Sequence, residues 1–214
     1  NGITMQGDCD FCFANARACG FVYEPEFDDV VKMLQVLRDE KPVPAPAVQF
    51  SGGEPTMHPR IIDFVRAAYA RDIRFVMLNT NGKRIARDDR FLTELEKVRP
   101  SFYFQFDGFE RETYRAIRGE PDIFEEKLRA LDRLAAIGLD VTIVPAIERG
   151  VNEHEIGRIV EFAIAHPAVR GITFQPAFHA GRHSAHDPMQ RMTIPEIVRL
   201  IETQTAGKFV ASDF

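Results

Sequence analysis

Three cysteines near the start of the chain are the residues best suited to metal or redox chemistry: Cys9, Cys12 and Cys19. An odd number in a chain of this size argues against a disulfide framework. Cys9 and Cys12 form a Cys-x-x-Cys pair, a spacing that places two thiolates on one metal centre or in one redox pair. Zinc knuckles and redox dithiols share this spacing, so the pair alone does not distinguish between them. Cys19 lies outside the spacing, and we expect it to be a buried or bystander thiol.

A second group with chemical potential is the loop formed by Ser51, Gly52, Gly53 and Glu54, which Pro55 ends. Two adjacent glycines let the backbone approach a ligand closely, because no Cβ atom intervenes. The Glu54 carboxylate can accept hydrogen bonds that fix either the loop itself or the ammonium group of a ligand. A loop of this kind on its own is more often a turn than a site, so its position in the fold decides its meaning.

The elements that position these loops follow one pattern, in which a short apolar strand alternates with an amphipathic helix. The ends of the expected strands lie between 28 and 38 residues apart, the length of a strand, a crossover helix and two loops. Residues 3–5 add a first strand, and six units indicate an open barrel because eight would close one. We therefore predict an α/β fold, a partial (β/α)6 barrel of parallel strands with outer helices. The later strands are expected to end near Phe50, Leu78, Phe106, Val144 and Gln175.

Ligands of parallel β/α folds bind at the carboxyl ends of the strands, and the two loops lie at successive strand ends. The cysteine pair follows residues 3–5, and the Gly-Gly-Glu loop follows the next strand. The joint occurrence of the two motifs at successive strand ends indicates a binding site far more specifically than either motif does alone. Further polar residues follow the other strands and are expected to line the same site: Thr80, Asn81, Gln105, Asp107 and Gln175, with Arg118 a short way further on.

The two loops together resemble the radical S-adenosylmethionine (SAM) superfamily. Its signature is three cysteines spaced C-x-x-x-C-x-x-C, with an aromatic residue before the last, followed by a Gly-Gly-Glu loop. Cys9, Phe11 and Cys12 match the second cysteine, the aromatic residue and the third cysteine. The resemblance implies a 4Fe-4S cluster bound by Cys9 and Cys12, with SAM on the iron that has no protein ligand.

The resemblance also implies an activity, that of a radical SAM oxidoreductase or transferase. Such an enzyme reductively cleaves SAM to a 5′-deoxyadenosyl radical, which acts on an unactivated carbon to form a C–C bond or transfer a methyl group. The implied partners are a small-molecule or lipid substrate and an electron donor such as ferredoxin or flavodoxin. Residues 13–16, 48–50, 104–108 and 174–176 look like one branch, which holds archaeal tetraether-lipid synthases and pterin-methylating enzymes.

Individual roles follow from the same resemblance. Gln105 and Asp107 are expected to face the ribose or the methionine carboxylate of SAM, and Arg118 is expected to face that carboxylate. No side chain is singled out as catalytic, because the cofactors carry the difficult chemistry. The implied cofactor-binding residues are Phe11, Ser51, Gly52, Gly53, Glu54, Thr80, Asn81, Gln105, Asp107, Arg118 and Gln175.

The pattern breaks at the first cluster position, four residues before Cys9, where Met5 stands. A thioether is neutral and is a poor replacement for a thiolate on iron, so Met5 is not expected to be a ligand. Three explanations are open. First, Met5 is a natural or engineered variant of the expected cysteine. Second, a stretch of chain is missing before Cys9 and the numbering closes the gap. Third, two cysteines and another group bind the cluster.

The composition sets outer limits. A chain of 214 residues with 45% hydrophobic residues is long enough for one domain, and we expect a single core domain over 1–214, cut at both ends. The net charge is −5 and the basic residues are scattered, so no nucleic-acid partner is expected. No apolar run approaches the length of a bilayer span, and we expect a cytoplasmic protein without a transmembrane segment.

Two other functions compete with the leading one. The first is a metal-binding or scaffold domain that kept the barrel and lost the cluster, and Met5 is its best support. The second is a β/α-barrel lyase or aldolase whose Gly-Gly loop binds phosphate. It lacks a convincing Schiff-base lysine, since Lys83 is the only candidate near a strand end. The three histidines after the last strand favour a polar loop over the substrate entrance rather than a metal site: His179, His183 and His186.

Overall fold

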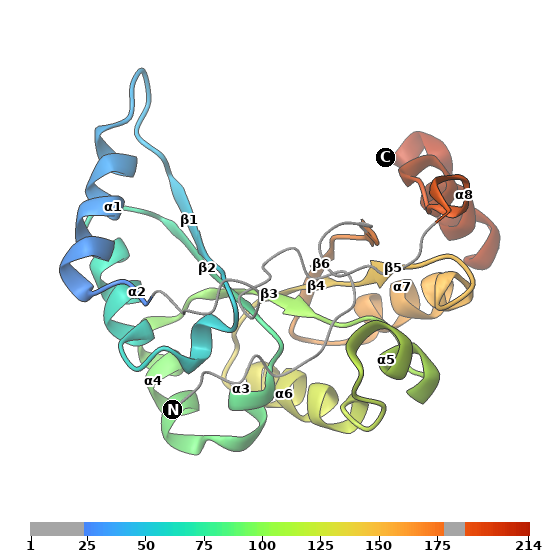
Figure 1. Ribbon diagram of the computed structural model, residues 1–214, viewed down its shortest axis with the longest axis horizontal. Helices are drawn as coiled ribbons and strands as arrows, with labels where there is room; N and C mark the ends of the chain where they lie inside the picture. The colour runs from blue at the N-terminus through green and yellow to red at the C-terminus, as the bar shows by residue number, and fades with distance from the viewer. Residues whose placement is uncertain (1–23, 178–186) are drawn as a thin grey trace.

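The computed structural model describes residues 24–177 and 187–214. Its centre is a five-stranded sheet in the order β1-β2-β3-β4-β6, in which every neighbouring pair of strands is parallel. Helices alternate with the strands along the chain and lie on the outer side of the sheet (Figure 1). The predicted α/β fold is therefore confirmed. The strands are β1 Ala47–Phe50, β2 Phe75–Thr80, β3 Ser101–Gln105, β4 Val141–Val144 and β6 Val169–Ile172.

Local signals explain where several helices begin. The Asp88 carboxylate accepts a hydrogen bond of 2.9 Å from the backbone N–H of Phe91 and so caps α4. The Glu196 carboxylate accepts one of 2.9 Å from the backbone N–H of Thr193 at the start of α8. The helices are α1 Phe27–Asp39, α2 Ile61–Tyr69, α3 Lys83–Arg87, α4 Asp89–Val98, α5 Arg111–Arg118, α6 Phe124–Ala136, α7 Ile156–Ala165 and α8 Ile194–Gln204, with 3-10 turns η1 Pro55–Met57, η2 Glu153–Glu155, η3 Pro188–Gln190 and η4 Ala211–Asp213.

The core lies between the sheet and the outer helices. Alternate side chains of β2 and β3 point to this side, where Leu78, Phe102 and Phe104 are at most 1% exposed. They pack in one cluster with apolar residues of the helices, among them Leu95 of α4 and Leu131 of α6. Burying each such side chain contributes about 1.5–3 kcal/mol, so this layer fixes where the strand ends lie.

The opposite face of the same strands carries polar residues. Asn79, Tyr103 and Thr142 are only partly buried, and the strand register places them side by side across β2, β3 and β4. A parallel sheet is normally covered by apolar side chains on both faces. A polar row on the face away from the helices therefore marks this face as the one suited to a ligand.

The last two units are extended by a small second sheet. β5 Ala146–Ile147 follows Pro145, and it pairs in parallel with β7 Gln175–Pro176. The strand predicted to end near Gln175 therefore ends at Ile172 in the main sheet, and β7 continues its direction. Proline has no N–H to donate, which interrupts the regular ladder at Pro145. Its carbonyl still accepts a hydrogen bond of 2.9 Å from the Gln175 N–H.

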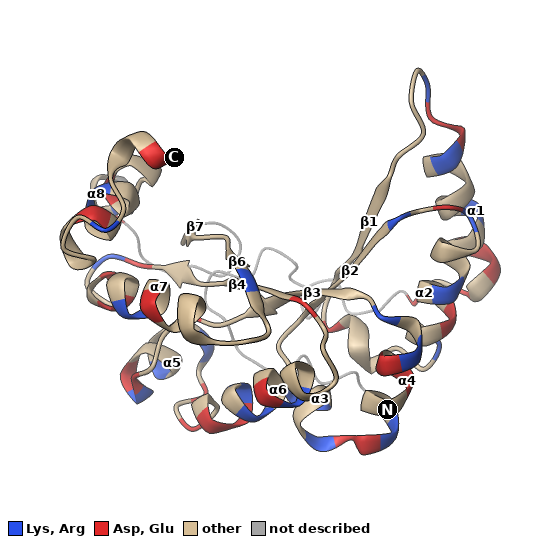
Figure 2. Cartoon of the chain, turned by 180° about the vertical axis from the view of Figure 1, so that it is seen from behind, with Lys and Arg blue, Asp and Glu red and all other residues tan. Residues whose placement is uncertain are grey.

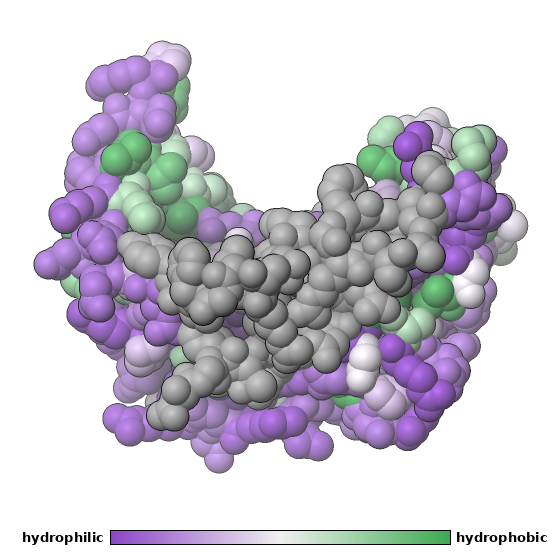
Figure 3. Space-filling view, viewed as in Figure 1, coloured by the Kyte–Doolittle hydropathy of each residue, from purple (hydrophilic) through white to green (hydrophobic). Residues whose placement is uncertain are grey.

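Charge and shape complete the description. Lys and Arg are interspersed with Asp and Glu over the described helices, and neither sign gathers into one patch (Figure 2). Seen from the side, the described part of the molecule is curved. Its two raised ends are formed by α1 and α8, and a hollow lies between them (Figure 3). None of the helices formed by residues 24–177 and 187–214 is long and apolar enough to cross a lipid bilayer.

Candidate functional site

The Gly-Gly-Glu loop is held in place by the carboxylate of Glu54. Its Oε1 atom accepts hydrogen bonds from the backbone N–H and the hydroxyl of Thr56, at 3.1 Å and 2.6 Å. The same oxygen accepts one of 2.7 Å from the Thr80 hydroxyl, and Oε2 accepts one of 2.7 Å from the Asn81 N–H. Four donors thus bind one carboxylate and join the loop after β1 to the end of β2. Of the two roles predicted for Glu54, this geometry supports fixing the loop.

Gly52 leaves room beside that loop. Its backbone has a φ of +139°, which L-amino acids with side chains rarely adopt, and a Cβ built there would meet no atom within 4 Å. Ser51, Gly52 and Gly53 are all exposed. A fixed loop with an open space against its backbone fits a ligand that approaches the peptide groups closely.

Thr80 and Asn81 continue the same scaffold at the end of β2. The Thr80 hydroxyl accepts a hydrogen bond of 3.1 Å from the Gly82 N–H, and Asn81 Oδ1 accepts one of 3.0 Å from the Lys83 N–H. Both side chains therefore shape the turn into α3. The contacts with a cofactor predicted for them from the sequence stay predictions.

Asp107 and Arg118 form a buried bidentate ion pair. The Nε and Nη2 atoms of Arg118 donate to the two carboxylate oxygens of Asp107 at 2.8 Å and 2.7 Å. The Ala146 N–H adds a bond of 3.1 Å to Oδ1. Asp107 is 0% exposed and Arg118 is 8% exposed. These contacts favour a role for Asp107 in holding the loop after β3, and its predicted contact with SAM stays a prediction.

Further buried polar groups secure the turn that follows Asp107. The Asn152 amide donates to the carbonyl oxygens of Asp107 and Ala146, both at 2.8 Å. The Tyr114 hydroxyl donates to the Gly108 carbonyl at 2.8 Å, and burial, with the Asp107 carboxylate second, raises the pKa of Tyr114 well above 10.0. The hydroxyl therefore stays a donor at any physiological pH.

Glu155 supplies the last part of this anchor. Its carboxylate accepts hydrogen bonds from the Phe109 N–H at 2.6 Å and from the Thr113 hydroxyl at 2.5 Å. A Cβ atom on Gly108 would lie 2.3 Å from the Oε1 atom of Glu155, which explains why glycine occupies that position. Sequence reasoning missed Glu155 and Asn152, because each has a partner more than 40 residues away along the chain.

Lys127 is a third buried polar residue that the sequence did not reveal. It lies on α6 and is 1% exposed. Its ammonium donates to the carbonyl oxygens of Asn81 and Gln105 at 3.2 Å and 2.8 Å, and to the Gln105 side-chain oxygen at 3.1 Å. Burial lowers the pKa of Lys127 from 10.5 to about 8. Lys127 directly follows an acidic stretch that resembles a solvated helix face, so no sequence signal distinguished it.

Gln175 reaches the polar face of the sheet. Its side-chain amide donates a hydrogen bond of 3.2 Å to the hydroxyl of Tyr103, a member of the polar row defined above. Gln105 follows Tyr103 two residues later on the same strand and is also partly exposed. The structure thus brings the predicted residues Gln105 and Gln175 to the same face. Several predicted residues lie outside the described part of the chain: Met5, Cys9, Phe11, Cys12, Cys19, His179, His183 and His186.

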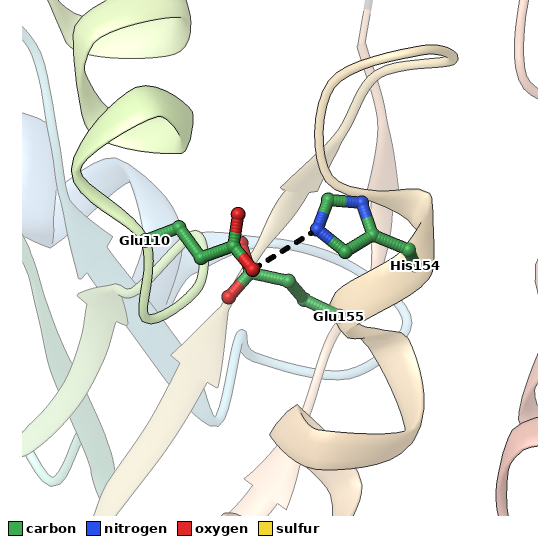
Figure 4. A group of neighbouring side chains, drawn as sticks. All are labelled: Glu110, His154 and Glu155. Atoms are coloured by element: carbon green, nitrogen blue, oxygen red, sulfur yellow. Dashed lines mark ion pairs between the residues drawn. The ribbon is translucent and has the colours of Figure 1, made fainter.

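One further group of side chains has the composition of a metal site. The ligand atoms of Glu110, His154 and Glu155 lie within 4.8 Å of one another, and His154 Nε2 is 3.3 Å from the Glu110 carboxylate (Figure 4). Both oxygens of Glu155 already accept hydrogen bonds from Phe109 and Thr113. The other two side chains are exposed, so an ordinary surface ion pair beside a structural carboxylate explains the group.

Comparison with known proteins decides the family. The family model described as the Radical SAM superfamily matches residues 6–163. The chain belongs to the radical SAM superfamily. This membership confirms the resemblance and decides against the lyase or aldolase hypothesis. Lys83, the lysine on which that hypothesis depended, is buried and paired with Glu120.

A radical SAM relative places the chain within the superfamily. The 7,8-dihydro-6-hydroxymethylpterin dimethyltransferase of Methanocaldococcus jannaschii is 37% identical over 211 residues, which cover 97% of this chain and 41% of the relative. The chain therefore spans less than half of the length of that relative. The similarity agrees with the branch of pterin-methylating enzymes that the sequence motifs indicated.

Solved structures share the fold. The Streptococcus suis protein SuiB, bound to its precursor peptide SuiA, superposes with a TM-score of 0.70 at 17% identity, covering 94% of this chain and 43% of SuiB. The protein anSMEcpe, with bound AdoMet and a peptide, gives a TM-score of 0.69 at 14% identity, covering 94% of this chain and 55% of anSMEcpe. At these identities the likeness shows the radical SAM fold alone.

Proposed function

We propose that this protein binds SAM at the carboxyl ends of β1, β2 and β3 and uses it, with a 4Fe-4S cluster, for radical chemistry. The observation that carries the proposal is the loop from Gly52 to Glu54, held by four hydrogen bonds to one carboxylate, two of which come from the end of β2. The loop presents exposed glycine backbone in a chain of the radical SAM superfamily.

The groups around the loop suit the chemistry of SAM. Its methionine end carries an ammonium and a carboxylate, and its ribose carries hydroxyls. The glycine backbone offers carbonyl acceptors and N–H donors at close range, because no Cβ intervenes. The Gln105 side chain offers amide N–H groups at the end of β3. These residues bind and orient the cofactor.

The cluster ligands are less complete. Cys9 and Cys12 supply two thiolates, and Met5 stands where the superfamily signature has the first cysteine. The donor set present in the sequence is therefore one thiolate short of three. When bound, a reduced 4Fe-4S cluster supplies the electron that cleaves SAM to a 5′-deoxyadenosyl radical. We infer that a soluble reductant such as ferredoxin or flavodoxin delivers that electron in the cytoplasm.

For the substrate, we propose a small polar molecule that is methylated at an unactivated carbon. The relative from Methanocaldococcus jannaschii is a pterin dimethyltransferase by its name, and it aligns with 97% of this chain. The polar row of Asn79, Tyr103 and Thr142 supports this choice, since hydroxyl and amide groups match a polar ring better than a lipid chain. Residues 1–214 form one core domain of this enzyme in our proposal.

The first prediction tests the proposal through the missing thiolate. The protein with Met5 is expected to hold little iron after anaerobic reconstitution. Two thiolates hold the cluster weakly, so solvent can reach an iron and the cluster is lost. Met5→Cys should raise the iron content to about four per chain, the number in one cluster. It should also allow reductive cleavage of SAM to 5′-deoxyadenosine. Iron analysis and chromatography of the products, run side by side on both proteins, give the two readouts.

Equal and high iron in both proteins would show that another group completes the cluster site. Absence of iron and of 5′-deoxyadenosine from both would favour the alternative, a metal-binding or scaffold domain on the same barrel. Met57→Cys is a matched control, because Met57 is exposed on η1 and belongs to no ligand motif. It should leave the iron content of the starting protein unchanged.

A second prediction concerns the glycine loop. Gly53→Val should abolish SAM binding with little effect on folding, because a branched side chain on this exposed loop would occupy the space of the cofactor. Calorimetry on reconstituted Met5→Cys protein, with and without Gly53→Val, measures the binding, and thermal unfolding measures the fold. Unchanged affinity would assign the glycine to a plain turn.

A further inference from the structure

Lys127 is a buried cation whose hydrogen bonds within the described part of the chain all go to neutral oxygens at the strand ends. Its three ammonium protons match three acceptors, the carbonyls of Asn81 and Gln105 and the side-chain oxygen of Gln105. None of the described residues places a carboxylate in hydrogen-bond contact with it. A buried ammonium is costly unless its donors are satisfied, so this arrangement has to be specific.

The ammonium determines which way the Gln105 amide points. Lysine only donates hydrogen bonds, so the Gln105 atom that faces Lys127 has to be the oxygen. The amide N–H groups of Gln105 then point away from Lys127. Without the lysine, the two ends of the amide are nearly equivalent in shape, and the side chain is free to rotate. The lysine therefore selects the state of Gln105 that offers donors to a ligand.

The same ammonium connects the other strand ends. The Asn81 peptide is held from two sides, because its N–H donates to Glu54 at 2.7 Å and its carbonyl accepts from Lys127 at 3.2 Å. Glu54 belongs to the glycine loop after β1, and Lys127 reaches β3 through Gln105. One chain of hydrogen bonds thus runs across the carboxyl ends of β1, β2 and β3.

We propose that Lys127 is a positioning residue of the SAM site, which fixes the Gln105 amide with its N–H groups toward the bound cofactor and clamps the end of β2. This inference rests on the proposed function, since it assigns a role within that site. A carboxylate or a ribose oxygen is the chemistry that outward N–H donors recognise. Lys127 touches no reacting atom in this proposal and acts through Gln105 and Asn81.

The charge of Lys127 adds a pH dependence. Burial lowers the pKa of this group from 10.5 to about 8, opposed by the carboxylates of Asp107 and Glu54 and aided by the cations Arg118 and Lys83. The positive charge is therefore lost as the pH rises through about 8, and the hold on Gln105 weakens. Folding responds in the opposite direction. Between about pH 8 and 10.5 the unfolded chain binds the proton and the folded chain does not, so stability rises with pH.

The third prediction follows for SAM binding by reconstituted Met5→Cys protein, which is the starting protein for these variants. Lys127→Met should weaken the binding at about pH 7 roughly tenfold or more, the effect of one hydrogen bond to a charged group. Gln105→Met should weaken it to a similar extent, and the double variant should add little to either, because both changes break one unit. Lys83→Met is the matched control, a buried lysine that pairs with Glu120 instead of the strand ends. Its affinity for SAM should stay within a factor of about three of the starting protein, since no contact to Gln105 changes.

The pH profile separates positioning from a merely structural role. The affinity should fall severalfold between about pH 7 and 9, while Lys127→Arg, which keeps its charge, loses less. The amino group of SAM titrates near pH 8 as well, so a pH effect of the ligand itself appears in both proteins. The comparison with Lys127→Arg separates that effect from the titration of Lys127. A titration of Lys127 followed by 13C NMR, in protein without cofactor, should give a pKa near 8. This arm uses the unmodified protein and remains decisive even if Lys127→Met fails to fold.

Three results would overturn the proposal. Equal affinity of the starting protein and Lys127→Met for SAM would show that Gln105 needs no such support. Additive losses in the double variant would show that the two residues act separately. A Lys127 pKa near 10.5 would contradict the pH dependence, and it would also contradict the buried contacts from which that dependence follows. If the Met5→Cys starting protein takes up its cluster but binds no SAM while Lys127 titrates near 8, the proposed function is wrong and this role is lost with it.

Discussion

The Glu54→Gln variant is expected to lose about 3 kcal/mol of unfolding free energy and most of its affinity for SAM. The carboxylate accepts four hydrogen bonds, two within its own loop and two from the end of β2. Glutamine keeps one acceptor oxygen and turns N–H groups toward at least one of these donors. Hydrogen bonds to a charged group contribute about 1.5–3 kcal/mol each, and an unpaired buried donor adds a penalty.

Urea unfolding measures the stability of this variant, and calorimetry on reconstituted protein measures the binding. Glu96→Gln is the control, since Glu96 is exposed on α4. Its unfolding free energy should change by less than about 0.5 kcal/mol, as is usual for surface positions. A Glu54→Gln protein with normal stability that binds no SAM would assign the carboxylate to the ammonium group of the cofactor. That outcome would choose the other of the two roles that its sequence context predicted.

The Asp107→Ala variant is expected to lose about 3–5 kcal/mol of unfolding free energy, the usual effect of removing one partner of a buried ion pair. Two hydrogen bonds from the Arg118 guanidinium and one from the Ala146 N–H disappear together. Because Asp107 is 0% exposed, binding of SAM should weaken only as far as the loop after β3 moves. Thermal and urea unfolding measure the first effect, and calorimetry measures the second.

Asp122→Ala provides the matched control for this pair. Asp122 pairs with Arg111 on the surface, where the side chains are 70% and 64% exposed. Exposed pairs of this kind contribute about 0–1 kcal/mol, so the control should unfold almost as the starting protein does. If Asp107→Ala instead keeps its stability and loses affinity for SAM, the carboxylate contacts the cofactor as the family resemblance implied.

The sequence by itself determined the fold class and the edge of the sheet at which the proposed site lies. The alternation of Phe102 and Phe104 with Tyr103 and Gln105 is a local pattern, because successive side chains of a strand point to opposite faces. Helical spacing between the strands then requires parallel pairing through crossover helices. Since parallel strands end at one edge, Gly52 and Gln105 had to meet there. None of this depends on distant contacts, and family membership together with the parallel sheet confirms the fold class.

The partners of the polar side chains were decided only by the tertiary structure. Lys127, Asn152 and Glu155 look like surface residues of helices and turns in the sequence, since nothing local marks a buried charge. Each has at least one acceptor or donor that lies 22 to 46 residues away, and packing of the helices against the sheet brings these groups together. Similarly, the loop after β1 left two roles open for Glu54, and the hydrogen bond from the Asn81 N–H favours one of them, fixing the loop. Hydrogen bonds act over about 3 Å, so their partners are fixed only when the whole chain is folded.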